Sequence, residues 1–282
     1  CGGSLPRHTA RPEWRISAIA ACRSIMDQEG NPREEETVDG ILGGRLRMIQ
    51  KKRGYRFSVD ALLLAHFAVL REGEELVDLG TGSGIVALVL AKRFICRRVL
   101  GIDIQEGLVD MARRNVALNG LDGCVEIRKG DVRQPESWCG PQSFSVAVFN
   151  PPYRRLRSGR MNPDTEKAVA RHEIAATAGD FIAAAVYALR PEGRAYAIYP
   201  AARAVQLLCR MRDFRIEPKR IRMVHSDPDS PGAFVLVEGV KGGREDLKVL
   251  PPLHIHCKEG GYSPDMEGIF RALSDFPAHG GC

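Results

Sequence analysis

The chain alternates short apolar runs with longer segments in which apolar residues recur at helical spacing. Apolar runs of four or five residues predict five strands, at 76–79, 99–103, 125–128, 146–149 and 195–199. Helical spacing predicts three helices between them, at 85–93, 107–119 and 180–189. Strands separated by helices pair in parallel through right-handed crossovers, so this order predicts an α/β fold with a doubly wound sheet.

The last two predicted strands break this rhythm. Strands at 220–224 and 234–240 are separated by a segment too short for a helical crossover, which predicts an antiparallel C-terminal hairpin.

Capping residues indicate where two of the helices begin. Ser58 precedes an apolar run at 59–67 and is expected to cap it, and Thr177 with Asp180 fits a capping box for the helix at 180–189.

The two ends of the chain carry no comparable pattern. Residues 1–40 are rich in Arg, Glu, Pro and Gly, without a sustained period, and are expected to be a disordered or linker extension. The main domain is expected at 41–240, and 241–282 is interpreted as a C-terminal extension built of loop.

Composition adds two constraints. The formal charge of +6 and a pI near 9.0 favour a polyanionic partner. No run approaches the ~18 apolar residues that a membrane span requires, so we expect no membrane contact. His254, His256 and Cys257 lack a fourth partner at a characteristic spacing, and no metal site is expected.

A glycine-rich loop follows the first predicted strand and opens the first predicted helix. It contains Asp78, Gly80, Gly82 and Gly84, at the carboxyl end of the strand, where open α/β sheets bind ligands. A dinucleotide fingerprint requires a further glycine where Ile85 stands. The segment resembles instead the nucleotide-proximal motif of class I S-adenosylmethionine methyltransferases, which cradles a cofactor without phosphates. This resemblance implies that Asp78 faces the amino or sulfonium end of that cofactor.

Two more acidic residues end the next two predicted strands. Asp103 can accept both ribose hydroxyls, as an acidic residue does in nucleotide-binding folds. Asp131 resembles the residue that receives the adenine amino group in these methyltransferases. Three acidic residues at three successive strand ends, in register with one glycine loop, predict a cofactor site.

Asn150, Pro151, Pro152 and Tyr153 follow the fourth predicted strand and form the candidate catalytic motif. An exocyclic amino nitrogen such as adenine N6 is a poor nucleophile because its lone pair is delocalised into the ring. The Asn150 side-chain oxygen and the Pro151 carbonyl can accept its two hydrogens, and two prolines fix the direction of that carbonyl. The Tyr153 ring can stack on a flipped planar base, which is worth ~1 to 3 kcal/mol.

A basic segment follows immediately. Arg154, Arg155, Arg157 and Arg160 lie at the expected mouth of the acceptor pocket, where they are placed to contact RNA phosphates.

The chain from about 45 to 240 resembles the bacterial tRNA(Val) adenine-37 N6-methyltransferase family. The resemblance rests on four segments, at 57–64, 78–84, 150–153 and 170–173. It implies a Rossmann-like class I methyltransferase fold, S-adenosylmethionine as cofactor, tRNA as partner and a cytoplasmic location; we assume a monomer. It also implies that Asp60, within the 56–60 segment, closes over the methionine end of the cofactor, to which Asn150 is also expected to bind.

Three alternatives stay open. A release-factor-type glutamine N5-methyltransferase uses the same motif, but that family carries a long helical domain before the glycine loop, and only 58–70 is clearly helical here. The second alternative is an rRNA guanine N2-methyltransferase, a nearer relative than the glutamine enzyme. The third alternative is an RNA-binding module that retains the fold without catalysis, and such a module would not bind the cofactor.

Overall fold

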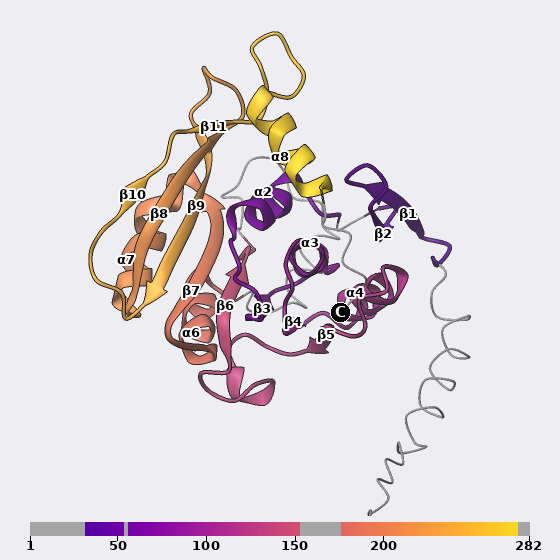
Figure 1. Ribbon diagram of the computed structural model, residues 1–282, viewed down its shortest axis with the longest axis horizontal. Coiled ribbons are helices and arrows are strands. Elements are labelled where there is room, and N and C mark those ends of the chain that lie inside the picture. The colour runs from indigo at the N-terminus through magenta and orange to yellow at the C-terminus, as the bar shows by residue number, and fades with distance from the viewer. Residues whose placement is uncertain (1–31, 54–55, 153–175, 276–282) are drawn as a thin grey trace, which may run out of the picture.

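The computed structural model describes residues 32–53, 56–152 and 176–275. Over these residues the chain forms a nine-stranded sheet between two helical layers and a separate two-stranded hairpin (Figure 1). The order across the large sheet is β10 (Lys248–Val249), β8 (Ile216–His225), β9 (Gly232–Lys241), β7 (Leu189–Pro200), β6 (Phe144–Phe149), β3 (Glu75–Leu79), β4 (Arg98–Asp103) and β5 (Val125–Lys129). The short strand β11 (Leu253–His254) pairs with β8.

The parallel half of the sheet confirms the predicted α/β fold. Its strands are β3 (Glu75–Leu79), β4 (Arg98–Asp103), β5 (Val125–Lys129), β6 (Phe144–Phe149) and β7 (Leu189–Pro200). The chain adds β4 and β5 on one side of β3 and then crosses to add β6 on the other. This reversal beside β3 is the position where open α/β sheets bind ligands.

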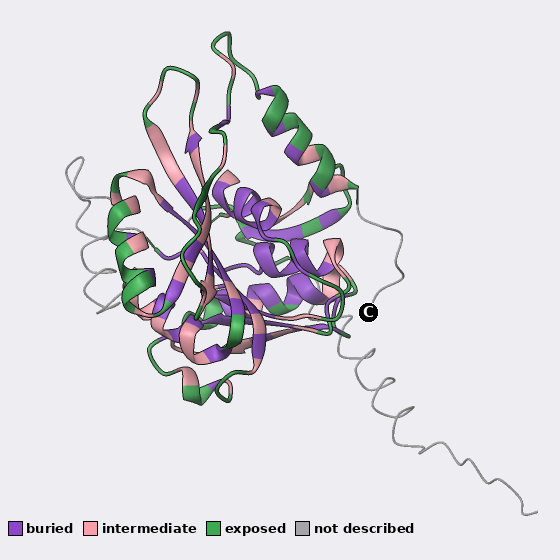
Figure 2. Cartoon of the chain, turned by 60° about the vertical axis from the view of Figure 1, so that its left-hand side comes forward, coloured by how far each residue is buried: buried purple, intermediate pink, exposed green. Residues whose placement is uncertain are grey.

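Apolar side chains alternate between the two faces of these strands. One face packs against α2 (Val59–Phe67), α3 (Ile85–Arg93), α4 (Glu106–Leu118) and α8 (Pro264–Ser274). The other packs against α6 (Ala178–Ala188) and α7 (Ala204–Asp213). In Figure 2, α3 is buried along almost its whole length, whereas α7 and α8 each expose one side. Burial on both faces explains the continuous apolar runs of the central strands.

The antiparallel C-terminal hairpin is also confirmed. β8 (Ile216–His225) pairs with β9 (Gly232–Lys241), and β9 pairs antiparallel with β7. The capping box of α6 forms as predicted, with Thr177 accepting from the backbone of Asp180 and Asp180 accepting from that of Thr177.

Both ends of the chain contain structure that the sequence did not predict. β1 (Glu36–Ile41) pairs with β2 (Leu46–Lys51). The expectation that 1–40 is a disordered or linker extension is therefore wrong for residues 36–40. The tail expected to be loop forms β10 (Lys248–Val249), β11 (Leu253–His254) and α8, which packs Met266 and Leu273 into the core. The division of the chain into three parts stays a prediction.

Asn115 of α4 and Asn119, the C-cap residue of that helix, form hydrogen bonds with the free edge of β2. Asn115 accepts from the N–H of Ile49 at 2.6 Å and donates to its carbonyl at 3.1 Å. Asn119 makes the same pair of hydrogen bonds with Arg47, at 3.0 and 2.7 Å. A helical i,i+4 step rises about 6 Å and a strand i,i+2 step about 6.6 Å, so the two spacings match. The asparagines thus act in place of a neighbouring strand.

The C-terminal end of α2 is held by three arginines from other elements. Arg93 of α3, Arg194 of β7 and Arg220 of β8 donate to carbonyls in and just past its last turn. Cations at this end also interact favourably with the helix dipole. The helix is therefore fixed against the sheet, and this fixes the position of Asp60 in its first turn.

Candidate functional site

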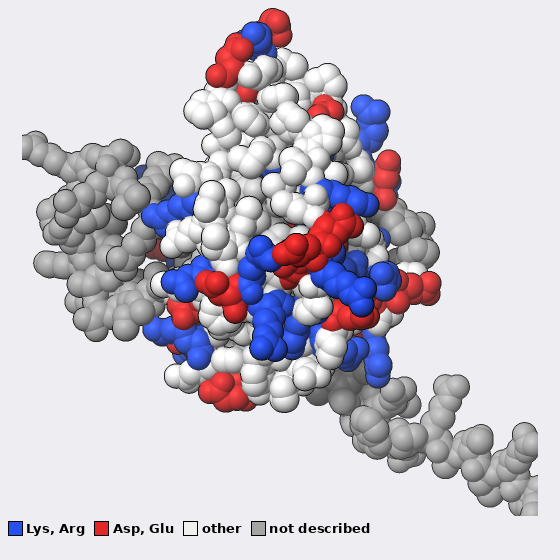
Figure 3. Space-filling view, turned by 90° about the vertical axis from the view of Figure 1, so that its left-hand side faces the viewer, with Lys and Arg blue, Asp and Glu red and all other residues white. Residues whose placement is uncertain are grey.

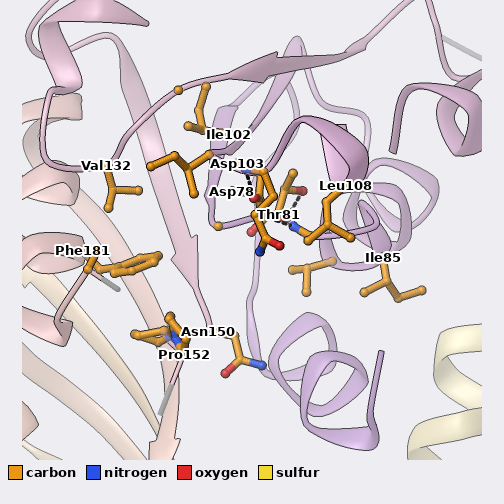
Figure 4. Close-up of a pocket in the computed structure, with 18 of the residues that line it drawn as sticks. Asp78, Thr81, Ile85, Ile102, Asp103, Leu108, Val132, Asn150, Pro152 and Phe181 are labelled. Carbon is orange, nitrogen blue, oxygen red and sulfur yellow. Dashed lines mark hydrogen bonds between the residues drawn. The ribbon is translucent and has the colours of Figure 1, made fainter. Parts of the chain in front are cut away.

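A cavity of about 1010 Å³ lies at the carboxyl ends of the central strands. Its lining comes from segments far apart in the chain, including the glycine loop, the ends of β4 and β5, the residues after β6, and α6. Figure 4 shows Asp78, Thr81 and Asp103 grouped on one side, with Asn150, Pro152 and Phe181 on the other. The residues predicted from four strand ends thus meet in one place.

The glycine loop has a backbone that only glycine adopts readily. Gly80, Gly82 and Gly84 have φ angles of 71°, 58° and 88°. A Cβ on Gly80 would lie 2.9 Å from the ring of Phe181. The loop is held against β4, because the N–H groups of Gly80 and Thr81 both donate to the carbonyl of Ile102.

Asp78 is buried beneath this loop. It accepts a hydrogen bond from the Thr81 hydroxyl at 2.7 Å. Burial raises the pKa of the Asp78 carboxyl to about 7, against the opposing effect of the Thr81 hydrogen bond. A carboxyl with this pKa responds strongly to a nearby cation, which stabilises its ionised form.

Asp103 links the end of β4 to the loop. Its Oδ2 accepts from the N–H of Gly82 at 2.9 Å, and its Oδ1 accepts from the N–H of Gln105 at 2.9 Å. Burial raises the pKa of this carboxyl, although both N–H groups favour the charged form. Each carboxylate oxygen has a second lone pair, so Asp103 can accept two further hydrogen bonds from a ligand.

Asp131 lies at the cavity rim and is paired with Arg133. The Arg133 Nε lies 2.9 Å from Asp131 Oδ2, and its backbone N–H donates to Oδ1 at 2.9 Å. The Arg133 side-chain hydrogen bond is the main reason why the pKa of Asp131 lies below its ordinary value. The sequence pattern did not predict that Arg133 would pair with Asp131.

Asn150 is oriented by Asp60, a residue 90 positions earlier in the chain. The Asn150 Nδ2 donates to Asp60 Oδ2 at 3.0 Å. The NH₂ group of the amide therefore faces Asp60, because the amide nitrogen donates hydrogen bonds whereas the amide oxygen only accepts them. This orientation commits Asn150 Oδ1 to the opposite direction. Within the described parts of the chain, Oδ1 is buried and has no hydrogen-bond partner.

Asp60 is itself held locally. Its Oδ1 accepts from the N–H of Ala61 at 3.0 Å and from the hydroxyl of Ser58. Ser58 occupies the N-cap position of α2, but its side chain makes no capping hydrogen bond, so the predicted cap is wrong. The hydroxyl is used to orient the Asp60 carboxylate instead.

The remaining predicted site residues divide into two groups. Pro151 and Pro152 line the cavity beside Asn150. Tyr153 and the four arginines predicted to contact RNA lie outside the described residues. The prediction missed Phe181 and Thr81, although Thr81 lies inside the glycine loop and its hydroxyl could have been noticed there.

The described residues contain neither a candidate membrane span nor a candidate metal-binding cluster. No helix among them is long and apolar enough to cross a membrane. No group of three or more His, Cys, Asp and Glu side chains there is arranged to hold a metal ion.

The chain is similar to known proteins over the residues that form this site. The methyltransferase small domain family matches residues 58–208. A tRNA1(Val) (adenine(37)-N6)-methyltransferase of Porphyromonas gingivalis is 32% identical over 193 residues, which cover 67% of this chain and 75% of the relative. The enzyme of the same name from Photobacterium profundum is 27% identical, over 77% of this chain and 90% of the relative.

A solved structure supports the fold. A predicted O-methyltransferase of Agrobacterium tumefaciens superposes with a TM-score of 0.63 at 20% identity, over 76% of this chain and 96% of its own length. At this identity the likeness concerns the fold alone.

The buried Asp78 predicts a specific pH dependence of stability. Its pKa rises from 3.8 to about 7 on folding. Between these values the unfolded chain has lost the proton that the folded chain still holds, so stability falls as pH rises from about 4 to about 7. Urea unfolding at about pH 5 and about pH 8 should therefore show a larger loss of stability in the wild type than in Asp78→Asn, which stays neutral.

The exposed Glu72→Gln variant is the control for loss of a carboxylate. It should behave like the wild type. Equal losses of stability in the wild type and Asp78→Asn would show that Asp78 does not titrate in this range.

Proposed function

The chain belongs to the methyltransferase small domain family, and we propose that it methylates the N6 of an adenine in tRNA, with adenine 37 of tRNA(Val) as the leading target. The family resemblance expected from the sequence is confirmed. S-adenosylmethionine is the cofactor, as predicted. The observation that carries the acceptor assignment is the buried, unpartnered Oδ1 of Asn150.

The residues present fit this cofactor. The three left-handed glycines leave the loop backbone open to close approach, and Asp103 retains lone pairs for ribose hydroxyls. Asp131 is proposed to receive the adenine amino group, and Asp78 to lie toward the cationic end. When bound, the cofactor supplies an electrophilic methyl group on a sulfonium sulfur.

Asn150 is proposed to act on the acceptor nitrogen. An unpaired buried acceptor costs ~1 to 3 kcal/mol, and a substrate amino group would satisfy it. Because Asp60 fixes the amide, Oδ1 need not reorganise as positive charge develops on the nitrogen. The Pro151 carbonyl is proposed to accept the second hydrogen and Tyr153 to stack on the base. No side chain has to remove a proton before attack.

The geometry of the site defines the type of reaction more closely than it defines the molecule that is methylated. A glutamine amide or a guanine N2 also presents two hydrogens on a planar nitrogen, so the Asn150 geometry alone does not separate them. Adenine in tRNA is favoured by the names of several relatives at 25 to 32% identity.

We further propose that the protein acts in the cytoplasm and that its partner is RNA. Arg154, Arg155, Arg157 and Arg160 stay proposed phosphate contacts beside the acceptor motif.

Asp103→Ala should weaken cofactor binding at least tenfold. A hydrogen bond to a charged group contributes about 1.5 to 3 kcal/mol, and this variant would lose two at the ribose. Calorimetric titration of S-adenosylmethionine measures the effect, with unfolding curves to confirm the fold. Asp122→Ala removes a carboxylate from the exposed turn before β5 and should bind as the wild type does. Unchanged affinity in a folded Asp103→Ala protein would remove Asp103 from the cofactor site.

Asn150→Ala should lower kcat by about 10² to 10³, by analogy with loss of one preorganised oxyanion-hole group. Methyl-labelled cofactor is offered with an unmodified tRNA(Val) transcript and, in parallel, with a release factor. Nucleoside mass spectrometry should find N6-methyladenosine. Label on protein glutamine but never on RNA would overturn the adenine proposal, and a wild-type rate in Asn150→Ala would overturn the acceptor site itself.

A further inference from the structure

We propose that the hairpin formed by β1 and β2, with the two residues that follow it, 52 and 53, is a rigid phosphate-binding platform that holds the tRNA backbone beside the acceptor cavity. This inference rests on the proposed function and assigns a surface to its substrate. Residues 45–53, which form β2 and the ends on either side of it, contain five basic side chains and no acidic one. The acidic residues of β1, Glu36 and Asp39, are paired with Arg114 and Arg56.

Most of this charge is exposed and unneutralised. Arg45, Arg47, Lys51 and Arg53 are all exposed, and no acidic side chain in the described chain pairs with any of them. Arg56 differs, because it forms an ion pair with Asp39 at 2.6 Å. Unpaired cations on a surface are available to displace counterions from a polyanion, which is the main source of affinity for nucleic acid.

The platform begins at the cavity. Lys51 and Arg56 contribute to the cavity lining, and β2 leads away from it toward the turn at Arg45. In Figure 1 the hairpin lies beside α4 at one end of the molecule. A strand rises about 3.3 Å per residue, so Arg47 lies about 13 Å from Lys51 along the strand. This length suits contacts to phosphates flanking a nucleotide held in the cavity.

The hairpin is fixed to the body of the protein. The amides of Asn115 and Asn119 pair with β2, as described above. The buried Arg114 guanidinium makes two hydrogen bonds to Glu36 of β1, at 2.6 and 2.7 Å. A backbone held in this way loses little further freedom on binding, so phosphate contacts are made at low entropic cost.

The opposite edge of the sheet has a different charge pattern. Figure 3 shows basic and acidic side chains interleaved on that face. Arg212 pairs with Glu217 and Glu245, and Arg220 pairs with Glu238. These pairs neutralise much of the local charge, so the hairpin is the better surface for a polyanion.

The test removes four charges from the hairpin while leaving both cavity-lining residues in place. The variant combines Arg45→Gln, Arg47→Gln, Lys52→Gln and Arg53→Gln. Its matched control combines Arg210→Gln, Arg215→Gln, Arg244→Gln and Lys248→Gln, all exposed residues on the opposite edge. Binding of the full chain to an unmodified tRNA(Val) transcript is measured over a series of salt concentrations, and S-adenosylmethionine affinity by calorimetry.

Each lost phosphate contact should reduce the slope of log affinity against log salt by about 0.7 to 0.9, so the hairpin variant should lose about 3 from this slope. Its tRNA affinity should fall at least tenfold at low salt, with cofactor affinity unchanged and the control close to the wild type. A hairpin variant with the slope and affinity of the wild type, or of the control, would overturn the platform.

The outcomes separate this inference from the proposed function. Methylated tRNA with hairpin-independent binding overturns the platform alone. Hairpin-dependent binding of a tRNA that is never methylated supports the platform and overturns the proposed adenine target. A wild-type chain that shows no salt-dependent binding of tRNA would overturn the platform.

Discussion

The hydrogen bond from Asn150 to Asp60 is the constraint on which the site depends. It joins the end of β6 to the first turn of α2, across 90 residues of chain, and decides which end of the Asn150 amide faces Asp60. How well this hydrogen bond orients Asn150 depends on how firmly α2 is held. The three arginines at the other end of that helix come from α3, β7 and β8, and Arg220 is in turn paired with Glu238 of β9. The antiparallel C-terminal hairpin therefore helps to orient a side chain at the opposite end of α2.

The glycine loop is constrained from three directions. Asp103 accepts from the N–H of Gly82, the Phe181 ring excludes any side chain at Gly80, and Asn115 donates to the carbonyl of Ser83 at 3.0 Å. Asn115 also pairs with β2, so the loop and the N-terminal hairpin share one buried side chain. The cofactor cavity and the proposed phosphate platform are thus parts of one rigid unit.

Much of the fold could be predicted because the central strands are buried on both faces and appear as uninterrupted apolar runs. The same logic placed Asp78, Asp103 and Asn150 together, since parallel strands bring their carboxyl ends to one edge. Prediction from the sequence failed where an element depends on a side chain distant in the chain, or where the sequence pattern was short. β1 depends on the buried ion pair of Glu36 with Arg114, 78 positions away. Ser58 looked like a helix cap, yet its hydroxyl donates to Asp60. Nothing in the local sequence indicated that Asp60 would hold Asn150.

The most direct test of this account is a double-mutant cycle on kcat with Asp60→Ala, Asn150→Ala and the double variant. If Asp60 acts by orienting Asn150, each single change slows turnover, and the double variant is no slower than Asn150→Ala alone. Cofactor affinity measured on all four proteins separates orientation from binding. Rate losses that multiply in the double variant would contradict the account, because they would mean that the two residues act independently.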